Sequence, residues 1–243
     1  MDHVTEHHPS YGLDGFDRVI LVHGFGAGPD EHWFPWLARS VPHLEALELP
    51  SPQAPRASIW VPMIAERIGS SLDSLAGLAI VTHSLGGIAA LRAIERVISS
   101  SPDHRDEQHL AAFIAVAPFA QHLPPTGEAE LDHFLITGLS DFLKGADPRE
   151  LRPFLGATTV IHSDNDPLVP QEASLDVATA LDADVVTVPG AGHFLASDGV
   201  TSLPQIGTTL RNQATPEVTP IRSSPPSWLD AQQQNLQHPS SHQ

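Results

Sequence analysis

The sequence predicts a doubly wound α/β domain, in which a mostly parallel sheet of about six strands carries helices on both faces. Short apolar runs alternate with longer amphipathic runs five times along the chain. Most of the short runs are continuously apolar, as expected for parallel strands that are covered on both faces. With 243 residues, of which 41% are hydrophobic, the chain can also bury a substantial core.

The predicted strands are the short apolar runs, and they cover residues 18–23, 45–49, 78–82, 112–117, 157–162 and 184–188. The predicted helices are the longer amphipathic runs at residues 31–40, 58–72, 85–98, 171–181 and 200–211. Residues 130–144 fall outside this alternation, so we expect them to form a small helical cover.

The two ends of the chain are predicted to lie outside the domain, which covers residues 17–211. Residues 1–16 are polar and lack the apolar core of a secretory signal, so we expect a flexible leader. Residues 212–243 are rich in Pro, Ser and Gln. They bury too little apolar surface to offset the entropy of ordering, which predicts a disordered tail.

Charge and composition exclude several functional classes. The 12 Lys and Arg residues against 29 Asp and Glu residues give a formal net charge of −17. A surface this acidic repels phosphate backbones and anionic lipids, so nucleic acid and membranes are not expected as partners. The chain has no cysteine, which excludes disulfides, thiolate metal sites and cysteine nucleophiles. We expect a cytoplasmic protein.

The segments that follow the predicted strands are the place to look for chemistry, because ligands of open α/β sheets bind beyond the carboxyl ends of the strands. These segments are His23-Gly24-Phe25-Gly26, Thr82-His83-Ser84-Leu85-Gly86-Gly87, Ser163-Asp164-Asn165-Asp166-Pro167 and Gly190-Ala191-Gly192-His193-Phe194. In chain order they supply a glycine-rich loop, a serine, a carboxylate and a histidine.

Ser84 is the candidate nucleophile. It ends a predicted strand and precedes a helix with Gly86 and Gly87 in its first turn. A helix N-cap alone does not need these glycines, each of which costs roughly 1 kcal/mol against alanine inside a helix. A strained nucleophile elbow does need small neighbours. Its pattern is Gly-x-Ser-x-Gly, and Thr82 departs from it at the first glycine.

A serine hydroxyl needs a base and an acid that orients the base. His193 is the candidate base, because glycines precede it on a tight loop after the final strand; His162 is the second choice. Asp164 and Asp166 compete for the acid, and we favour Asp166 because Pro167 fixes the direction of the loop. The order Ser, Asp, His is that of the α/β-hydrolases.

The loop after the first predicted strand is expected to supply half of an oxyanion hole, with the N–H groups of Phe25 and Leu85 as donors. A plain βα turn is the alternative. A nucleotide site is a second alternative, with Glu45 or Glu48 placed as a ribose-binding acid. Pro29 stands where a dinucleotide fingerprint requires glycine.

We expect the substrate pocket to involve Gly24, His83, Phe119 and Phe194, with Leu139 and Phe142 as further candidates for its walls. Trp33, Trp36 and Trp60 are more consistent with core positions than with an acyl pocket. No metal or organic cofactor is expected, because a serine, a histidine and a carboxylate suffice for acyl transfer.

At these residues the sequence resembles the small bacterial α/β-hydrolases of the YdeN-like type, which are related to the retinoblastoma-binding protein 9 serine hydrolases. The resemblance covers about residues 18–211. Its motifs are Leu21-Val22-His23-Gly24, Trp33-Phe34-Pro35-Trp36-Leu37, Leu49-Pro50-Ser51-Pro52, His83-Ser84-Leu85-Gly86-Gly87, Asn165-Asp166-Pro167-Leu168-Val169-Pro170, Gly192-His193-Phe194 and Asp198-Gly199-Val200-Thr201-Ser202-Leu203-Pro204.

The resemblance implies a compact α/β-hydrolase fold with little or no lid, and it tolerates a small residue other than glycine at position 82. It implies Ser84 as nucleophile, Asp166 as acid and His193 as base, acting on a small carboxylic ester or amide. Two rivals remain: a binding protein that keeps the fold without the activity, and a nucleotide-binding α/β protein. Transfer of the acyl group to an alcohol is a variant of the favoured function.

Overall fold

A computed structural model describes residues 16–69, 75–100, 109–145 and 147–214 of the chain. The six strands are β1 (Arg18–Val22), β2 (Leu44–Ala46), β3 (Leu78–His83), β4 (Ala112–Val116), β5 (Ala157–His162) and β6 (Asp184–Thr187). They form one sheet in the order β2-β1-β3-β4-β5-β6, and each neighbouring pair is parallel. This confirms the predicted fold class.

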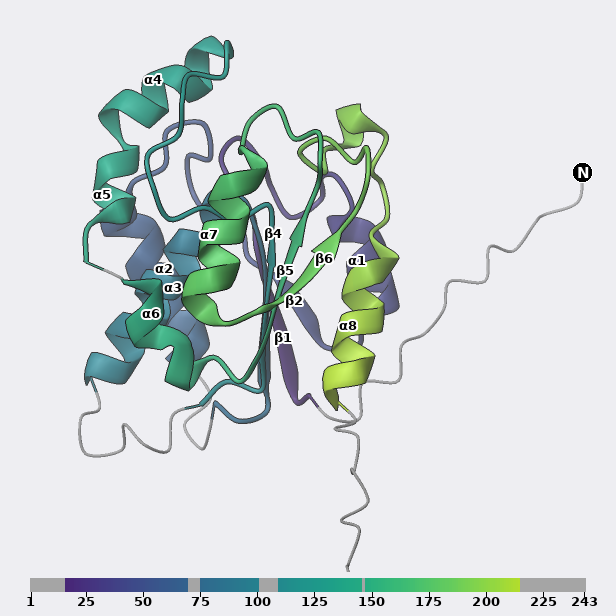
Figure 1. Cartoon of the computed structure of the whole chain (residues 1–243). Helices are drawn as coiled ribbons and strands as arrows, with labels where there is room; N and C mark the ends of the chain where they lie inside the picture. The colour runs from purple at the N-terminus through teal and green to yellow at the C-terminus, as the bar shows by residue number, and fades with distance from the viewer. Residues whose placement is uncertain (1–15, 70–74, 101–108, 146, 215–243) are drawn as a thin grey trace, which may run out of the picture.

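Helices cover both faces of the sheet (Figure 1). The larger face carries α2 (Ala57–Gly69), α3 (Leu85–Ser100) and α7 (Gln171–Leu181). The other face carries α1 (Phe34–Ser40) and α8 (Pro204–Ala214). The short helices α4 (Ala129–Thr137), α5 (Leu139–Leu143) and α6 (Pro148–Leu151) lie between β4 and β5 in the chain.

Each central strand contributes to two cores, one on each face of the sheet. In β1, Ile20 and Val22 pack with α2 and α3, whereas Val19 and Leu21 pack with α1 and α8. Successive side chains of a strand point to opposite faces, so a strand covered on both faces is expected to be apolar along most of its length. Every residue of β3 and β4 is buried, which explains why β4 is apolar throughout and why β3 is apolar up to Thr82 and His83 at its carboxyl end.

Several predicted boundaries differ from the structure. The predicted strand 45–49 is only the three-residue β2, after which Leu47 and Leu49 are buried in the core. The predicted helix 200–211 begins only at Pro204, and proline is favoured in a first helical turn.

The predictions for the chain ends fall largely outside the described residues, as do residues 70–72 of the predicted helix 58–72. Where the described chain overlaps them, Phe16 is buried and α8 continues to Ala214, three residues into the predicted tail.

Candidate active site

The strand order places a crevice where β1 and β3 lie side by side. The chain leaves β1 toward β2 on one side and continues from β3 toward β4 on the other. At such a switch point the loops beyond the carboxyl ends diverge and leave room for a ligand. Gly24 and Phe25 follow β1, and Ser84 and Leu85 follow β3, so both loops border this crevice.

Ser84 forms a sharp turn between β3 and α3. Its φ angle is +54°, a left-handed conformation that costs a non-glycine residue free energy and is common at functional sites. Its N–H donates to the Val116 carbonyl at 2.9 Å, and the residue is 8% exposed. The turn therefore presents Ser84 at the end of the most buried strands.

Gly86 is required by close packing, whereas Gly87 is not. A Cβ on Gly86 would lie 2.4 Å from the Val22 carbonyl oxygen and 2.6 Å from that of His23. A Cβ on Gly87 would make ordinary contacts, 3.4 Å from the Pro118 Cβ and 3.6 Å from the Thr82 Oγ1. The expectation that the turn needs both glycines is thus wrong for Gly87.

The loop after β1 packs directly against Ser84. A Cβ on Gly24 would lie 2.9 Å from the Ser84 Cβ and 3.5 Å from the Leu85 nitrogen. Within the described chain, the N–H groups of Phe25 and Leu85 donate to no protein acceptor. Two unpaired donors therefore belong to the two loops that meet at Ser84.

His193 and Asp166 form a buried hydrogen-bonded pair. His193 Nδ1 lies 2.8 Å from Asp166 Oδ2, and the two side chains are only 6% and 3% exposed. Asp166 Oδ1 also accepts the N–H groups of Leu168 and Val169 at 2.8 and 2.9 Å. An ionised carboxylate can only accept, so Nδ1 carries the proton and Nε2 is left as the basic nitrogen.

The competing candidates have other partners. Asp164 Oδ1 accepts the Gly190 N–H at 2.8 Å, and His162 Nε2 lies 2.9 Å from the Thr187 hydroxyl. Glu45, the candidate ribose-binding acid, forms ion pairs with Arg18 and Arg67. The geometry therefore joins Asp166, rather than Asp164, to His193.

The loop that carries His193 is hydrogen-bonded at four consecutive amides. The N–H groups of residues 190–193 donate in turn to Asp164 Oδ1, Ser163 Oγ, Asn165 Oδ1 and Asp198 Oδ2 at 2.8 to 3.0 Å. Asp198 Oδ2 also accepts the Leu195 N–H at 3.0 Å. Sequence reasoning missed this role of Ser163, Asn165 and Asp198, although all three fall within motifs of the resemblance or the strand-end segments.

His83 also forms a hydrogen bond to the loop that carries His193. Its Nε2 lies 2.9 Å from the His193 carbonyl oxygen, and a carbonyl only accepts, so Nε2 carries the proton. Nδ1 is buried without a partner among the described residues. Burial, together with the neighbouring His193, lowers the pKa of His83 well below its usual value. His83 is therefore neutral near pH 7.

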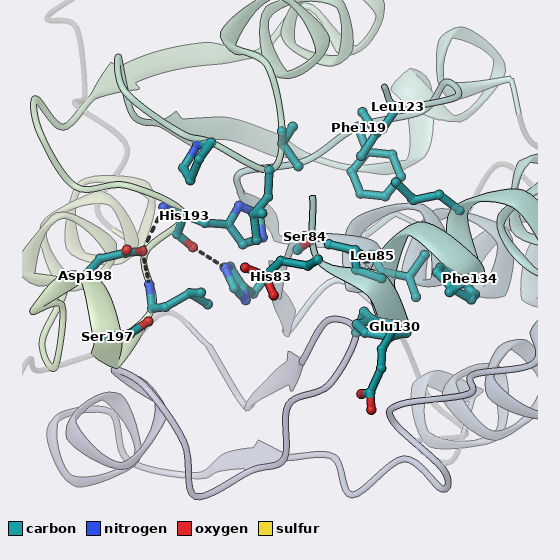
Figure 2. A pocket seen from close by; sticks show the side chains of 18 of the residues that line it. His83, Ser84, Leu85, Phe119, Leu123, Glu130, Phe134, His193, Ser197 and Asp198 are labelled. Carbon is teal, nitrogen blue, oxygen red and sulfur yellow. Dashed lines mark hydrogen bonds between the residues drawn. The ribbon is translucent and has the colours of Figure 1, made fainter. Parts of the chain in front are cut away.

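A cavity of about 670 Å³ opens beside Ser84 and His193. Figure 2 shows His83, Leu85 and Phe119 at its wall, together with Leu123 and residues of α4. The α4 residues were not predicted individually, but Leu131, Phe134 and Leu135 have the i, i+3, i+4 spacing of a helix face that packs inward.

Other predicted wall residues lie elsewhere. Phe194 is fully buried in the core beside α1 and α8, and Gly24 packs behind Ser84; neither lines the cavity. Leu139, Phe142 and the tryptophans Trp33, Trp36 and Trp60 are core residues. The prediction of core positions for the tryptophans is thus confirmed, and the predictions of wall positions for Gly24, Leu139, Phe142 and Phe194 are wrong.

The described residues contain no group of three or more His, Cys, Asp or Glu side chains arranged to hold a metal ion. Their helices also include none that is long and apolar enough to cross a membrane.

Comparison with known proteins gives consistent matches. The family model described as serine hydrolase matches residues 19–212. YdeN of Bacillus subtilis, which carries a provisional hydrolase name, is 30% identical over 192 residues, covering 77% of this chain and 90% of YdeN. The crystal structure of the B. subtilis ydeN gene product matches with a TM-score of 0.65 and 31% identity, covering 81% of this chain and 97% of that one.

A YdeN-like protein from Pectobacterium atrosepticum, at 21% identity, has the same fold, with a TM-score of 0.58 over 83% of this chain and 92% of its own. Together with the parallel sheet, these neighbours identify the fold as that of the α/β-hydrolases.

Proposed function

Because the chain belongs to the serine hydrolase family, we propose that it cleaves a carboxylic ester, or an amide or thioester, with Ser84, His193 and Asp166 as its catalytic triad. The observation that carries this proposal is the buried 2.8 Å contact between His193 Nδ1 and Asp166 Oδ2, beside a strained serine in the same cavity. This arrangement supplies a nucleophile, a base and an acid that fixes the base in the productive tautomer.

The reaction proceeds by acyl transfer in two steps. Ser84 Oγ attacks the substrate carbonyl carbon while His193 Nε2 takes the hydroxyl proton, and the Asp166 carboxylate stabilises the imidazolium. The bond to the leaving group then breaks, and Nε2 returns the proton to the leaving alcohol, amine or thiol. Water repeats the sequence on the acyl-enzyme, releasing a carboxylic acid and restoring Ser84.

The developing oxyanion requires donors that are already in place. The unpaired N–H groups of Phe25 and Leu85 supply two, and the close approach of Gly24 to Ser84 brings their loops together. Donors fixed in advance in a site that excludes water are worth several kcal/mol to the transition state, roughly 3–4 kcal/mol for one donor. No metal or organic cofactor enters these steps.

The decisive experiment is labelling of the purified protein with a fluorophosphonate probe, which reacts with activated serines. We expect wild type to be labelled and Ser84→Ala and His193→Ala to lose labelling. Ser197→Ala is the matched control, because Ser197 is a serine that also lines the cavity but has no role in the proposed mechanism. It should be labelled like wild type. Absence of labelling in a folded wild type would favour a binding protein that kept the fold without the activity.

Stabilisation by NAD or ATP, with indifference to Ser84→Ala, would instead favour the nucleotide-binding alternative. The ion pairs of Glu45 with Arg18 and Arg67 argue against that residue as the ribose-binding acid and leave Glu48 as the candidate for this alternative.

A further inference from the structure

The wall of the cavity that faces away from His193 is formed mainly by apolar side chains, with Glu130 of α4 as a charged exception. Phe119 and Leu123 come from the segment after β4, and Leu131, Phe134 and Leu135 come from α4. Phe119, Phe134 and Leu135 are 3%, 5% and 7% exposed, so their positions are fixed by packing. The centroid of the Phe134 ring lies 5.1 Å from that of Phe25 and 6.0 Å from that of Phe142, so the three rings pack together.

The position of this wall relative to Ser84 indicates which part of a substrate it contacts. Figure 2 shows His193 on one side of Ser84 and Phe119, Leu123 and Phe134 on the other. In acyl transfer the histidine returns its proton to the leaving group, so the leaving group lies on the His193 side. The acyl chain then extends across Ser84 toward α4 and the apolar wall.

The charges around the cavity disfavour an anionic chain. Among the described residues that line it there is no lysine or arginine, whereas Glu128, Glu130 and Asp198 are present. The Glu128 and Glu130 side chains make no ion pair or hydrogen bond with the described residues. A carboxylate on the acyl chain would lose water without gaining a cation, and burial of an unpaired charge is strongly unfavourable.

We propose that this cavity binds the acyl group of esters with an uncharged, apolar chain of medium length, about six to ten carbons, since the cavity has the volume of an ordinary small-molecule site and must also admit the leaving group. The inference rests on the proposed hydrolase function and specifies its substrate class. Phe119, Leu123 and the α4 residues Leu131, Phe134 and Leu135 are its specificity determinants.

The test uses 4-nitrophenyl esters of straight-chain acids from acetate to dodecanoate. We expect kcat/KM of wild type to rise about two- to fourfold for each added methylene, up to the length that fills the cavity, and then to fall. The 4-nitrophenyl half-ester of adipate, whose chain ends in a carboxylate, should react at least about 100-fold more slowly than the hexanoate.

Variants on α4 test whether this wall sets the profile. Phe134→Ala enlarges the cavity and should shift the optimum to longer chains. Ala129→Phe, at an exposed wall position, should shift it to shorter chains without opening the core. Ile136→Ala is the matched control: Ile136 lies on the same helix, is 80% exposed and does not line the cavity, so its profile should equal that of wild type.

The outcomes separate this inference from the proposed function. A flat profile, equal rates for the adipate half-ester and the hexanoate, or an unmoved optimum in Ala129→Phe would overturn the substrate class if fluorophosphonate labelling of Ser84 persists. Loss of both turnover and labelling in folded wild type would overturn the hydrolase function itself. If Phe134→Ala fails to fold, the Ala129→Phe variant and the comparison of the adipate half-ester with the hexanoate still test the proposed substrate class.

Discussion

The loops that carry Ser84 and His193 meet at one cavity, but different interactions hold them. Backbone packing fixes the Ser84 turn: a Cβ on Gly86 would overlap two carbonyl oxygens of the β1 end, and a Cβ on Gly24 would overlap Ser84. Hydrogen bonds fix the His193 loop, because side-chain oxygens accept hydrogen bonds from all four backbone N–H groups of residues 190–193.

This contrast determines which substitutions each loop tolerates. A packed turn cannot accept added volume, because overpacking against backbone forces the chain to move and typically costs 1–3 kcal/mol or more. A hydrogen-bonded loop accepts changes of size at its surface but not the loss of an acceptor, which leaves an N–H unpaired at about 1–3 kcal/mol.

The largest effect is expected at the acid that orients the base. Asp166→Asn keeps the size of the side chain but places an amide opposite His193 Nδ1, which favours the unproductive tautomer. We expect kcat/KM to fall by about 10³ to 10⁴, with the fold retained. Steady-state ester hydrolysis measures the fall.

Asp164→Asn is the control for this prediction, because asparagine keeps an oxygen that can accept the Gly190 N–H. Its activity should stay within about threefold of wild type. A larger loss in Asp164→Asn than in Asp166→Asn would reverse the assignment of the acid.

Alanine substitutions of the adjacent residues Gly86 and Gly87 test the packing of the Ser84 turn. Gly86→Ala forces a methyl group against the carbonyls of Val22 and His23, so we expect at least a 100-fold slower fluorophosphonate labelling and a loss of several kcal/mol in the free energy of unfolding. Gly87→Ala should label at the wild-type rate, because its Cβ makes ordinary contacts. Urea unfolding of both variants measures stability. Equal behaviour of the two variants would contradict the packing argument.

Much of this architecture could be predicted from the sequence, because it depends on local composition. Parallel strands covered on both faces are apolar along most of their length, so the sequence predicts the bounds of β3 and β4 to within one residue. Ser84, Asp166 and His193 follow β3, β5 and β6, and parallel strands end at the same edge of a sheet, so the sequence predicts all three residues at one edge.

The remaining features depend on contacts between distant segments. Gly86 and Gly87 look equivalent in the sequence, and only the approach of α3 to the end of β1 distinguishes them. Phe194 is buried in the core, and its loop has left-handed φ angles at Gly192 and at Phe194 itself, a conformation that the sequence does not indicate for a phenylalanine. The role of Asp198 depends on a turn that folds it back to His193, five residues earlier.

A smaller effect is expected at Asp198, on the hydrogen-bonded side of the comparison. Asp198→Ala removes the acceptor of the His193 and Leu195 N–H groups. The loop then loses its fixed position, and a small displacement of the base lowers kcat by about 10- to 100-fold while KM changes little. Asp198→Asn, which keeps one oxygen acceptor, should recover most of the activity. If both variants behave alike, Asp198 acts through its charge rather than as an acceptor for the loop.

The smallest effect concerns His83, which lies in the Ser84 turn and donates to the His193 carbonyl, so that it joins the two loops. Burial lowers its pKa well below the usual value of about 6.5. Between the two values the unfolded chain binds a proton that the folded protein does not, so the stability of the fold decreases as the pH falls below about 6.5. Each such group contributes up to about 1.4 kcal/mol per pH unit.

His83→Gln isolates this contribution, because glutamine keeps an N–H donor for the His193 carbonyl and does not titrate. Burial also lowers the pKa values of His23 and His32, but both histidines remain in the variant and their effect cancels in the comparison. Urea unfolding at pH 5, 6, 7 and 8 should show a weaker pH dependence in His83→Gln than in wild type. His122→Gln, at an exposed position, should keep the wild-type dependence. Equal slopes in all three proteins would mean that His83 binds its proton as readily in the fold as in the unfolded chain, and that its Nδ1 has access to water.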